Sequence, residues 1–145
     1  MRKLLLICLL AVFFVCGCSN ESDTWDTIVN KEWSNLEVWA GSGFYFHEDD
    51  NVKYCTFMIY GSGVNVAGYH TSEVRIDENR IVVIQLPSDY ASSYLGDEVL
   101  DVDSMSTVEL IYSNGMILVN DNEFEVNEGI SNYQYVIEIE DRKSE

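Results

Sequence analysis

The chain has 145 residues, 47% of them hydrophobic and 12% aromatic, with 25 acidic side chains against eight basic ones and a formal charge of −17. This length corresponds to one domain. Phosphate groups would repel so acidic a chain, so we expect no nucleic-acid partner, and the same charge disfavours electrostatic attachment to anionic lipid. The negative charge either serves only to keep the protein soluble or forms a surface complementary to a basic protein partner.

The first seventeen residues have the organisation of a secretory signal peptide. Arg2 and Lys3 form a short positive head, and the apolar run 4–15 is too short to remain as a membrane-spanning helix. The segment Val15-Cys16-Gly17-Cys18 follows. It resembles the lipobox of bacterial lipoproteins, and this resemblance implies a signal peptide over 1–17, lipidation of Cys18 and attachment to a membrane through the lipid. The alternative is an ordinary cleaved signal with a coincidental cysteine.

The resemblance also implies a location. Residues 18–24 would form a lipidated tether and residues 25–145 a barrel-like domain. In bacterial lipoproteins an Asp two positions after the cysteine is the usual inner-membrane retention signal, and Asn20 stands there instead. We therefore expect an exported protein on the outer membrane, facing the periplasm or the cell surface. Loss of residues 1–17 leaves six basic residues against 25 acidic ones, a formal charge of −19, and leaves Cys55 as the one cysteine besides Cys18.

The folded part begins with a helix and continues with strands. The spacing of Trp25, Ile28 and Val29 predicts a short helix over 23–31. From Trp33 onward the apolar residues recur with a period of two, which is typical of half-buried strands. Besides the first strand, which starts near Trp33, the expected strands are 44–48, 52–60, 69–76, 80–86, 107–112, 116–120, 123–126 and 133–140.

Well-marked turns separate these strands. Asp49-Asp50-Asn51, Asp77-Glu78-Asn79 and Ser113-Asn114-Gly115 each lie between two alternating runs, and Asn-Gly is a strong hairpin signal. About eight strands joined mostly by hairpins predict an all-β antiparallel meander with a short N-terminal helix. A meander of that number commonly closes into a small barrel, which removes exposed edges.

One segment interrupts this rhythm. Pro87 to Ser106 is long for a connection, and within it 88–96 predicts a turn of helix and 97–103 a short strand. Long insertions in compact domains are often lids or binding loops. We place the expected binding site at the barrel mouth near 87–103. Tyrosines pointing inward would suit a small ligand there, and the alternative is a plain aromatic core.

The two histidines lack the context of a catalytic centre. Neither His47 nor His70 lies in a nucleophile elbow or a triad pattern. His47 begins the ligand-rich run 47–51, which together with His70 offers possible zinc ligands. A polar hairpin tip is the plainer interpretation, so we predict no metal.

Two further sequence patterns give no support for a reactive cysteine or a calcium site. Cys55 shares a strand face with Phe57 and Ile59, which predicts a buried, unreactive thiol. The run 101–104 resembles the start of a calcium loop but has no central glycine. We therefore predict a protein that is not an enzyme and needs no cofactor.

The arrangement of the aromatic residues resembles a second family. Trp25 lies in the expected helix, Trp33 opens the first strand, and Phe44-Tyr45-Phe46-His47-Glu48 leads into the hairpin to Tyr54. This order and the overall size resemble the lipocalin-like small lipoproteins of bacteria. The resemblance implies a lipid-anchored envelope protein with a non-catalytic binding barrel, whose ligand-binding residues are unknown. The alternative is an acidic inhibitor or immunity protein that masks a basic protein.

Overall fold

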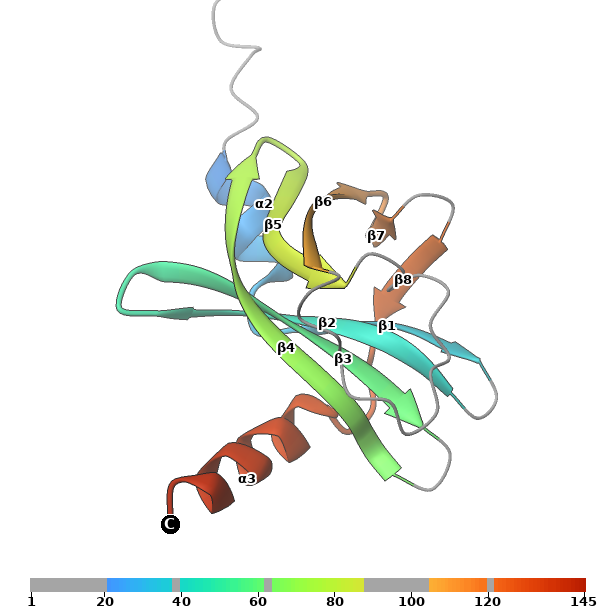
Figure 1. Ribbon diagram of the computed structural model, residues 1–145. Coiled ribbons are helices and arrows are strands. Elements are labelled where there is room, and N and C mark those ends of the chain that lie inside the picture. The colour runs from blue at the N-terminus through green and yellow to red at the C-terminus, as the bar shows by residue number, and fades with distance from the viewer. Residues whose placement is uncertain (1–20, 38–39, 62–63, 88–104, 120–121) are drawn as a thin grey trace, which may run out of the picture.

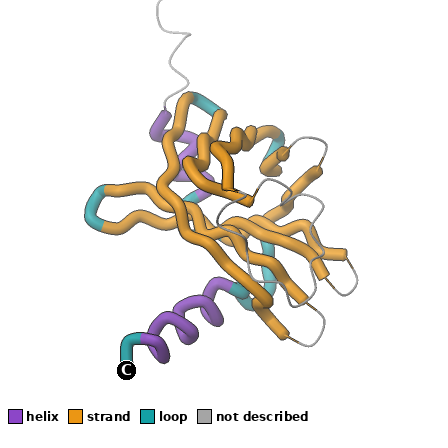
Figure 2. Tube along the Cα trace, in the orientation of Figure 1, coloured by secondary structure: helices purple, strands orange, loops and turns teal. Residues whose placement is uncertain are grey.

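Within the residues that the computed structural model describes, which are 21–37, 40–61, 64–87, 105–119 and 122–145, eight antiparallel strands form a closed barrel (Figures 1 and 2). The predicted all-β meander and its closure are confirmed. Among the described residues, one helix precedes the strands and one follows them. The elements are α2 (Glu21–Ile28), β1 (Glu32–Glu37), β2 (Ala40–Asp49), β3 (Val52–Gly61), β4 (Val64–Asp77), β5 (Arg80–Pro87), β6 (Met105–Ser113), β7 (Met116–Val119), β8 (Asn122–Val126) and α3 (Tyr133–Lys143).

Each strand pairs with the next along the chain, and the last pairs with the first. The closing register joins Trp33 of β1 to Val126 of β8, and Ser34 to Glu125. The ladder shifts between Ile59 and Gly61, where β3 meets β4, so this glycine marks an irregularity in the strand. Because β8 and β1 occupy each other's edges, the barrel offers no edge to a further strand.

The predicted turns are confirmed, and two of them have the geometry that suits a right-handed twist. Asp50 and Asn51 have φ values of 49° and 63°, and Asn114 and Gly115 have 53° and 81°. Positive φ at both central residues defines a type I′ turn, which Asp, Asn and Gly adopt at low cost.

In a meander, alternate connections lie at alternate ends of the barrel. The turns at 50–51, 78–79 and 114–115 therefore share one end, and α2 packs there too; we call it the α2 end. The described strands that end at the opposite end of the barrel border the segments 38–39, 62–63, 88–104 and 120–121, which lie outside the described residues. The helix and strand predicted within 88–103 therefore stay predictions.

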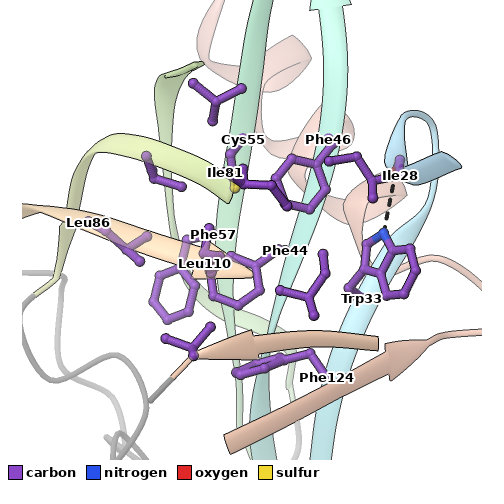
Figure 3. Packing of buried hydrophobic residues seen from close by; sticks show 14 of the residues in the cluster. Ile28, Trp33, Phe44, Phe46, Cys55, Phe57, Ile81, Leu86, Leu110 and Phe124 are labelled. Carbon is purple, nitrogen blue, oxygen red and sulfur yellow. Dashed lines mark hydrogen bonds between the residues drawn. The ribbon is translucent and has the colours of Figure 1, made fainter. Parts of the chain in front are cut away.

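Large apolar side chains fill the described interior (Figure 3). On β2 and β3 every second residue points inward, which places Phe44, Phe46, Cys55 and Phe57 in the core. Trp33 is buried beside them, and its indole Nε1 donates a hydrogen bond to the carbonyl oxygen of Ile28 over 3.3 Å. The residues that join them with 1% exposure or less are Ile28, Ile59, Ile81, Val83, Leu86, Leu110, Ile117, Val119 and Phe124.

The helix α2 covers the α2 end of this core. It begins at Glu21, inside the segment 18–24 expected as a tether. The Trp25 ring meets Phe46 edge-on at 6.4 Å, and its Nε1 donates to Glu48 Oε2 over 3.1 Å. The predicted N-terminal helix is therefore present, and it closes the barrel through its apolar face.

The predicted strand at 133–140 is wrong, because these residues form α3. Tyrosine and isoleucine alternate there with other residues, but Tyr133, Val136 and Glu140 also recur at helical spacing. Only Val136 of this helix is buried. Since the barrel is already closed by β1 and β8, this segment has no strand to pair with and packs on the outer wall instead.

Candidate functional site

Several tyrosines lie on the outer wall of the barrel beneath α3. Met58 and Tyr60 point away from the core because they alternate with the inward Phe57 and Ile59. They are nevertheless buried, because Val136 of α3 covers them. The expectation of an inward tyrosine lining is therefore wrong for this wall. A tyrosine hydroxyl needs a polar partner, which the outer wall supplies and the apolar core does not. Packed against this second cluster are Tyr45, Val66, Tyr69 and Tyr133.

A buried carboxylate joins α3 to the barrel. Glu32, the first residue of β1, is 3% exposed, and its two oxygens accept six hydrogen bonds. Two of them come from the backbone N–H groups of Asn132 and Tyr133 at the start of α3, over 2.6 and 3.3 Å. The other donors are the side chains of Tyr60, Asn127, Ser131 and Asn132.

These hydrogen bonds decide the charge of Glu32. Burial by itself would raise the pKa of the Glu32 carboxyl, but the donors from Asn132, Ser131, Asn127 and Tyr60 outweigh it and hold the pKa below its ordinary value. Glu32 is therefore a carboxylate anion, and both of its oxygens accept hydrogen bonds from donors within the protein. Burial and this anion together raise the pKa of the Tyr60 hydroxyl.

Gly43 makes room for this arrangement. A Cβ at this position would collide with the Tyr60 hydroxyl and lie 2.9 Å from the carbonyl oxygen of Trp33. The Tyr60 side chain therefore crosses β2 over Gly43 to reach Glu32, 2.9 Å away. A glycine is required here by the close approach of a side chain.

An aromatic stack continues from Glu32 across the outer wall. Tyr45 and Tyr133 lie face to face, with ring centroids 3.9 Å apart. His47 contacts Tyr133 at 5.4 Å and stacks on Tyr54 at 5.5 Å. Burial lowers the pKa of the His47 imidazole, although Asp49 opposes the shift, so the neutral ring is favoured in the stack.

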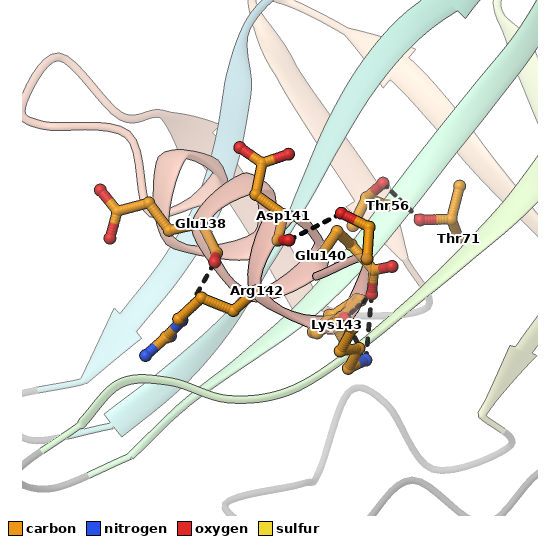
Figure 4. A network of polar contacts seen from close by, with 9 residues as sticks. Thr56, Thr71, Glu138, Glu140, Asp141, Arg142 and Lys143 are labelled. Carbon is orange, nitrogen blue, oxygen red and sulfur yellow. Dashed lines mark hydrogen bonds and ion pairs between the residues drawn. The ribbon is translucent and has the colours of Figure 1, made fainter.

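The polar atoms of this wall are also paired. The hydroxyl of the buried Thr56 lies 3.3 Å from His47 Nε2 and 2.8 Å from the hydroxyl of Thr71. At the far end of α3, Lys143 Nζ donates to Glu140 over 3.0 Å and to the Tyr69 hydroxyl over 2.8 Å (Figure 4). Tyr69 also donates to Glu140. Polar contacts thus fasten both ends of α3 to the wall.

Two grooves border α3 on the outside of the barrel. The first has a volume of about 320 Å³ and the second about 430 Å³. Tyr133 and Ile137 line both grooves. The first groove is also lined by Asn30, Lys31, Glu32, Tyr45, Val126, Asn127, Ser131 and Gln134, and the second by Tyr69, His70, Thr71, Val136, Glu140 and Asp141.

The structure does not bring the two histidines together. His47 pairs with the outward Tyr54, whereas His70 pairs with the inward Phe57, so their side chains occupy opposite faces of the sheet. The His70 Nε2 atom is buried and has no hydrogen-bond partner among the described residues. No group of three or more His, Cys, Asp or Glu side chains within the described ranges is arranged to hold a metal ion.

The remaining candidates from the sequence differ in whether the structure describes them. Cys55 is buried in the core, as predicted, and burial raises the pKa of its thiol. The lipidation candidate Cys18, the segment 101–104 and the expected binding mouth at 87–103 lie in parts of the chain that the structure leaves undescribed, apart from the end of β5 at Pro87. Among the helices that it does describe, none has the length and apolar character needed to span a membrane.

Comparison of the chain with protein-family models, with curated proteins and with solved structures finds no match. The grooves beside α3 are therefore defined by geometry alone.

Sequence reasoning missed Glu32 and the whole of α3. A signal for the helix was present, since Ser131 and Asn132 suit a helix start and Arg142 and Lys143 suit its last turn. Glu32 had no comparable signal. Apart from Tyr60, its partners lie about a hundred residues away in the chain, and only the closed barrel brings them together.

Proposed function

We propose that this chain is a lipid-anchored protein of the bacterial envelope, exported to the outer membrane, with a non-catalytic barrel that binds a partner. The lipobox-like segment ending at Cys18 supports the anchor, and the eight-strand barrel supports a binding domain. The buried Cys55 thiol and the separated histidines supply no support for a catalytic alternative.

One observation supports a binding surface on the outside of the barrel. The described core is filled by phenylalanine, tryptophan, isoleucine and leucine side chains with 1% exposure or less, whereas two grooves open on the outer wall beside α3. A filled interior of this kind leaves no volume for a ligand at those positions. A protein surface is therefore the better candidate for the partner than a small enclosed ligand.

The anchor is tested with Cys18→Ser. We expect the wild-type protein to incorporate a fatty-acid analogue during growth and to sediment with the outer membrane. Cys18→Ser should be unlabelled and either soluble or unprocessed, while Cys16→Ser, which changes the neighbouring cysteine of the signal, should behave as wild type. Equal labelling of wild type and Cys18→Ser would overturn the lipoprotein assignment.

An acidic inhibitor or immunity protein is the second candidate, and the charge at the α2 end favours it. Exposed carboxylates from α2, the β2–β3 turn and the β4–β5 turn share that end of the barrel. A true inhibitor would retain one basic protein at 1 M salt, where screening removes attraction by charge alone. Loss of every basic protein in that wash would exclude the inhibitor. The carboxylates are Asp23, Asp26, Glu48, Asp49, Asp50, Asp77 and Glu78.

A further inference from the structure

The flank of α3 is the side of the helix that borders the two grooves. It carries apolar side chains that are not buried in the described fold. Ile137 is 47% exposed although it lines both grooves, and Val126 is 38% exposed at the edge of the first. The stacked rings of Tyr45 and Tyr133 line the first groove with them. Rigid aromatic and aliphatic side chains in a shallow groove are the usual anchors of a protein interface.

Three exposed carboxylates accompany these apolar residues, and the basic side chain of Lys31 also lines the first groove. Glu125 adjoins Val126, Glu138 adjoins Ile137, and Asp141 lines the second groove; all three are exposed. Within the described part of the chain, none of these three carboxylates has a hydrogen bond or an ion pair. The basic side chains nearby make hydrogen bonds within the fold, and among them Arg142 Nε donates to the Glu138 carbonyl oxygen over 3.1 Å. Lys31 Nζ donates to the Thr27 carbonyl over 2.7 Å, and Lys143 Nζ is held by Glu140 and Tyr69.

The length of the flank limits the partner segment. α3 has 11 residues, which corresponds to about 16 Å at the rise of an α-helix. An extended chain covers that distance with about five residues. A lysine or arginine in such a segment can lay its apolar stem over the groove while its charged end reaches a carboxylate at the rim.

We propose that the flank of α3 binds a short extended segment of a basic protein, in which one or two apolar side chains are flanked by lysine or arginine. This inference rests on the proposed binding function and specifies its partner. The apolar side chains of the segment pack on Ile137, Val126 and Tyr133. Its cationic groups pair with Glu125, Glu138 and Asp141.

Titration of the isotope-labelled processed chain, residues 18–145 with Cys18→Ser, tests the proposal, because this chain contains every described element. The probe is the peptide acetyl-Lys-Leu-Lys-Leu-Lys-amide, and backbone amide shifts report where it binds. We expect saturable shifts confined to residues that line the two grooves. The peptide acetyl-Lys-Ser-Lys-Ser-Lys-amide, which keeps the charge and loses the apolar side chains, should bind at least about fivefold more weakly.

The matched variants are two exposed isoleucines on different walls. Ile137→Lys should weaken the leucine peptide at least about tenfold, since it removes the apolar anchor and adds a repelling charge. Ile111 is 38% exposed on β6, and Ile111→Lys should leave affinity within about twofold of wild type. Ile137→Ala, which favours the helix, should give an intermediate loss and shows whether a change at this site reflects unfolding.

Three results would overturn the proposal: equal binding of the serine and leucine peptides, shifts centred on the carboxylates of the α2 end, or an unchanged affinity in Ile137→Lys. None of these results tests Cys18. The lipid anchor is tested separately by the labelling experiment with Cys18→Ser. Absence of any peptide binding with an intact anchor would remove this partner class and leave the envelope assignment in place.

Discussion

The Glu32 carboxylate performs for α3 the role that a capping side chain performs for most helices. The N-cap residue Asn132 makes no side-chain cap bond of its own. Glu32 instead accepts the N–H groups of Asn132 and Tyr133 from the other end of the domain sequence. An anion at this position also interacts favourably with the positive end of the helix dipole. A single side chain thus sets where α3 begins and how it meets the barrel.

Glu32→Gln is expected to lower the free energy of unfolding at neutral pH by about 2–3 kcal/mol, because an amide cannot accept hydrogen bonds at both former oxygens. The folded pKa lies below the ordinary value of 4.5, so the unfolded chain takes up the proton first as pH falls. The stabilisation is therefore complete above pH 4.5 and is lost as pH falls through the folded pKa.

Urea denaturation from about pH 7 to pH 3 measures this effect. The difference between wild type and Glu32→Gln should be largest near neutrality and should shrink in acid. Glu125→Gln, which changes an exposed glutamate of the adjoining strand β8, should alter stability by less than about 0.5 kcal/mol. A pH-independent difference between wild type and Glu32→Gln would show that the charge of Glu32 has no part in stability.

Cys55 gives a prediction about the core. Its thiol is buried and its pKa is raised, so reagents that need the thiolate should modify the native protein slowly and the denatured protein fast. In the processed chain with Cys18→Ser, Cys55 is the single thiol. Cys55→Ser should lower stability by about 1–3 kcal/mol, because a buried hydroxyl lacks a partner, and Cys55→Ala serves as the control without a polar atom. Rapid labelling of the native protein would contradict the packing described here.

At the scale of elements, α3 is an addition to a barrel that is complete without it. It touches the outer wall through Val136, through the Tyr133 ring and through the polar contacts at its two ends, and it takes no part in strand pairing. Such an element can open locally while the barrel persists. Its stability should therefore depend on a few contacts, of which Val136 is the most buried.

Val136→Ala should lower the protection of α3 amides from hydrogen exchange and cost about 1–2 kcal/mol of local stability. Exchange in β3 and β5 should change little, since neither strand depends on α3 for its ladder. Ile139→Ala, on the same helix but not buried, is the matched control. Equal loss of protection throughout the barrel would mean that α3 and the strands unfold as one unit.

The elements predicted best from sequence are those specified by neighbours in the chain. The turns at Asp50-Asn51 and Asn114-Gly115 need residues that tolerate positive φ, and the sequence displays them. Helix α2 was equally visible in its spacing. The eight residues 133–140 were ambiguous because they fit both periods, and the choice between strand and helix depended on β8 having already closed the barrel onto β1.

The candidate site was less predictable for the same physical reason. Its grooves exist because α3 lies against β2 to β4, and its central anion is made possible by Gly43, Tyr60 and a segment some hundred residues after Glu32. The tyrosines were noticed in the sequence, but Tyr45, Tyr60 and Tyr133 lie on the outer wall, whereas Tyr112 packs against the core. Alternation tells which residues share a face, and it does not tell which face a helix will later cover.

At the scale of the whole molecule, the excess of negative charge is the dominant electrostatic property. The described residues contain two ion pairs, Arg80–Glu109 and Lys143–Glu140, both between exposed side chains. Exposed pairs of this kind contribute little to stability. Repulsion among the remaining carboxylates therefore opposes the compact state at low salt.

Added salt should consequently stabilise the domain. The urea midpoint at pH 7 should rise between about 0.01 and 0.5 M sodium chloride, over which the screening length falls from about 30 Å to a few ångströms. Potassium chloride should act like sodium chloride, because screening depends on ionic strength. A midpoint that falls with salt would mean that the two ion pairs outweigh the repulsion.

The position of α2 gives the molecule a polarity relative to its proposed anchor. Cys18 precedes Glu21, the first residue of α2, by three positions, so an acyl chain on Cys18 would hold the α2 end within about 10 Å of the lipid surface. Seven exposed carboxylates gather at that same end, and anionic head groups would repel them across such a distance. The acyl chain would hold the α2 end near the membrane, while the anionic head groups would repel the carboxylates at that same end. The anchored domain would then stand upright on the membrane, with the end of the barrel opposite α2 directed away from the lipid.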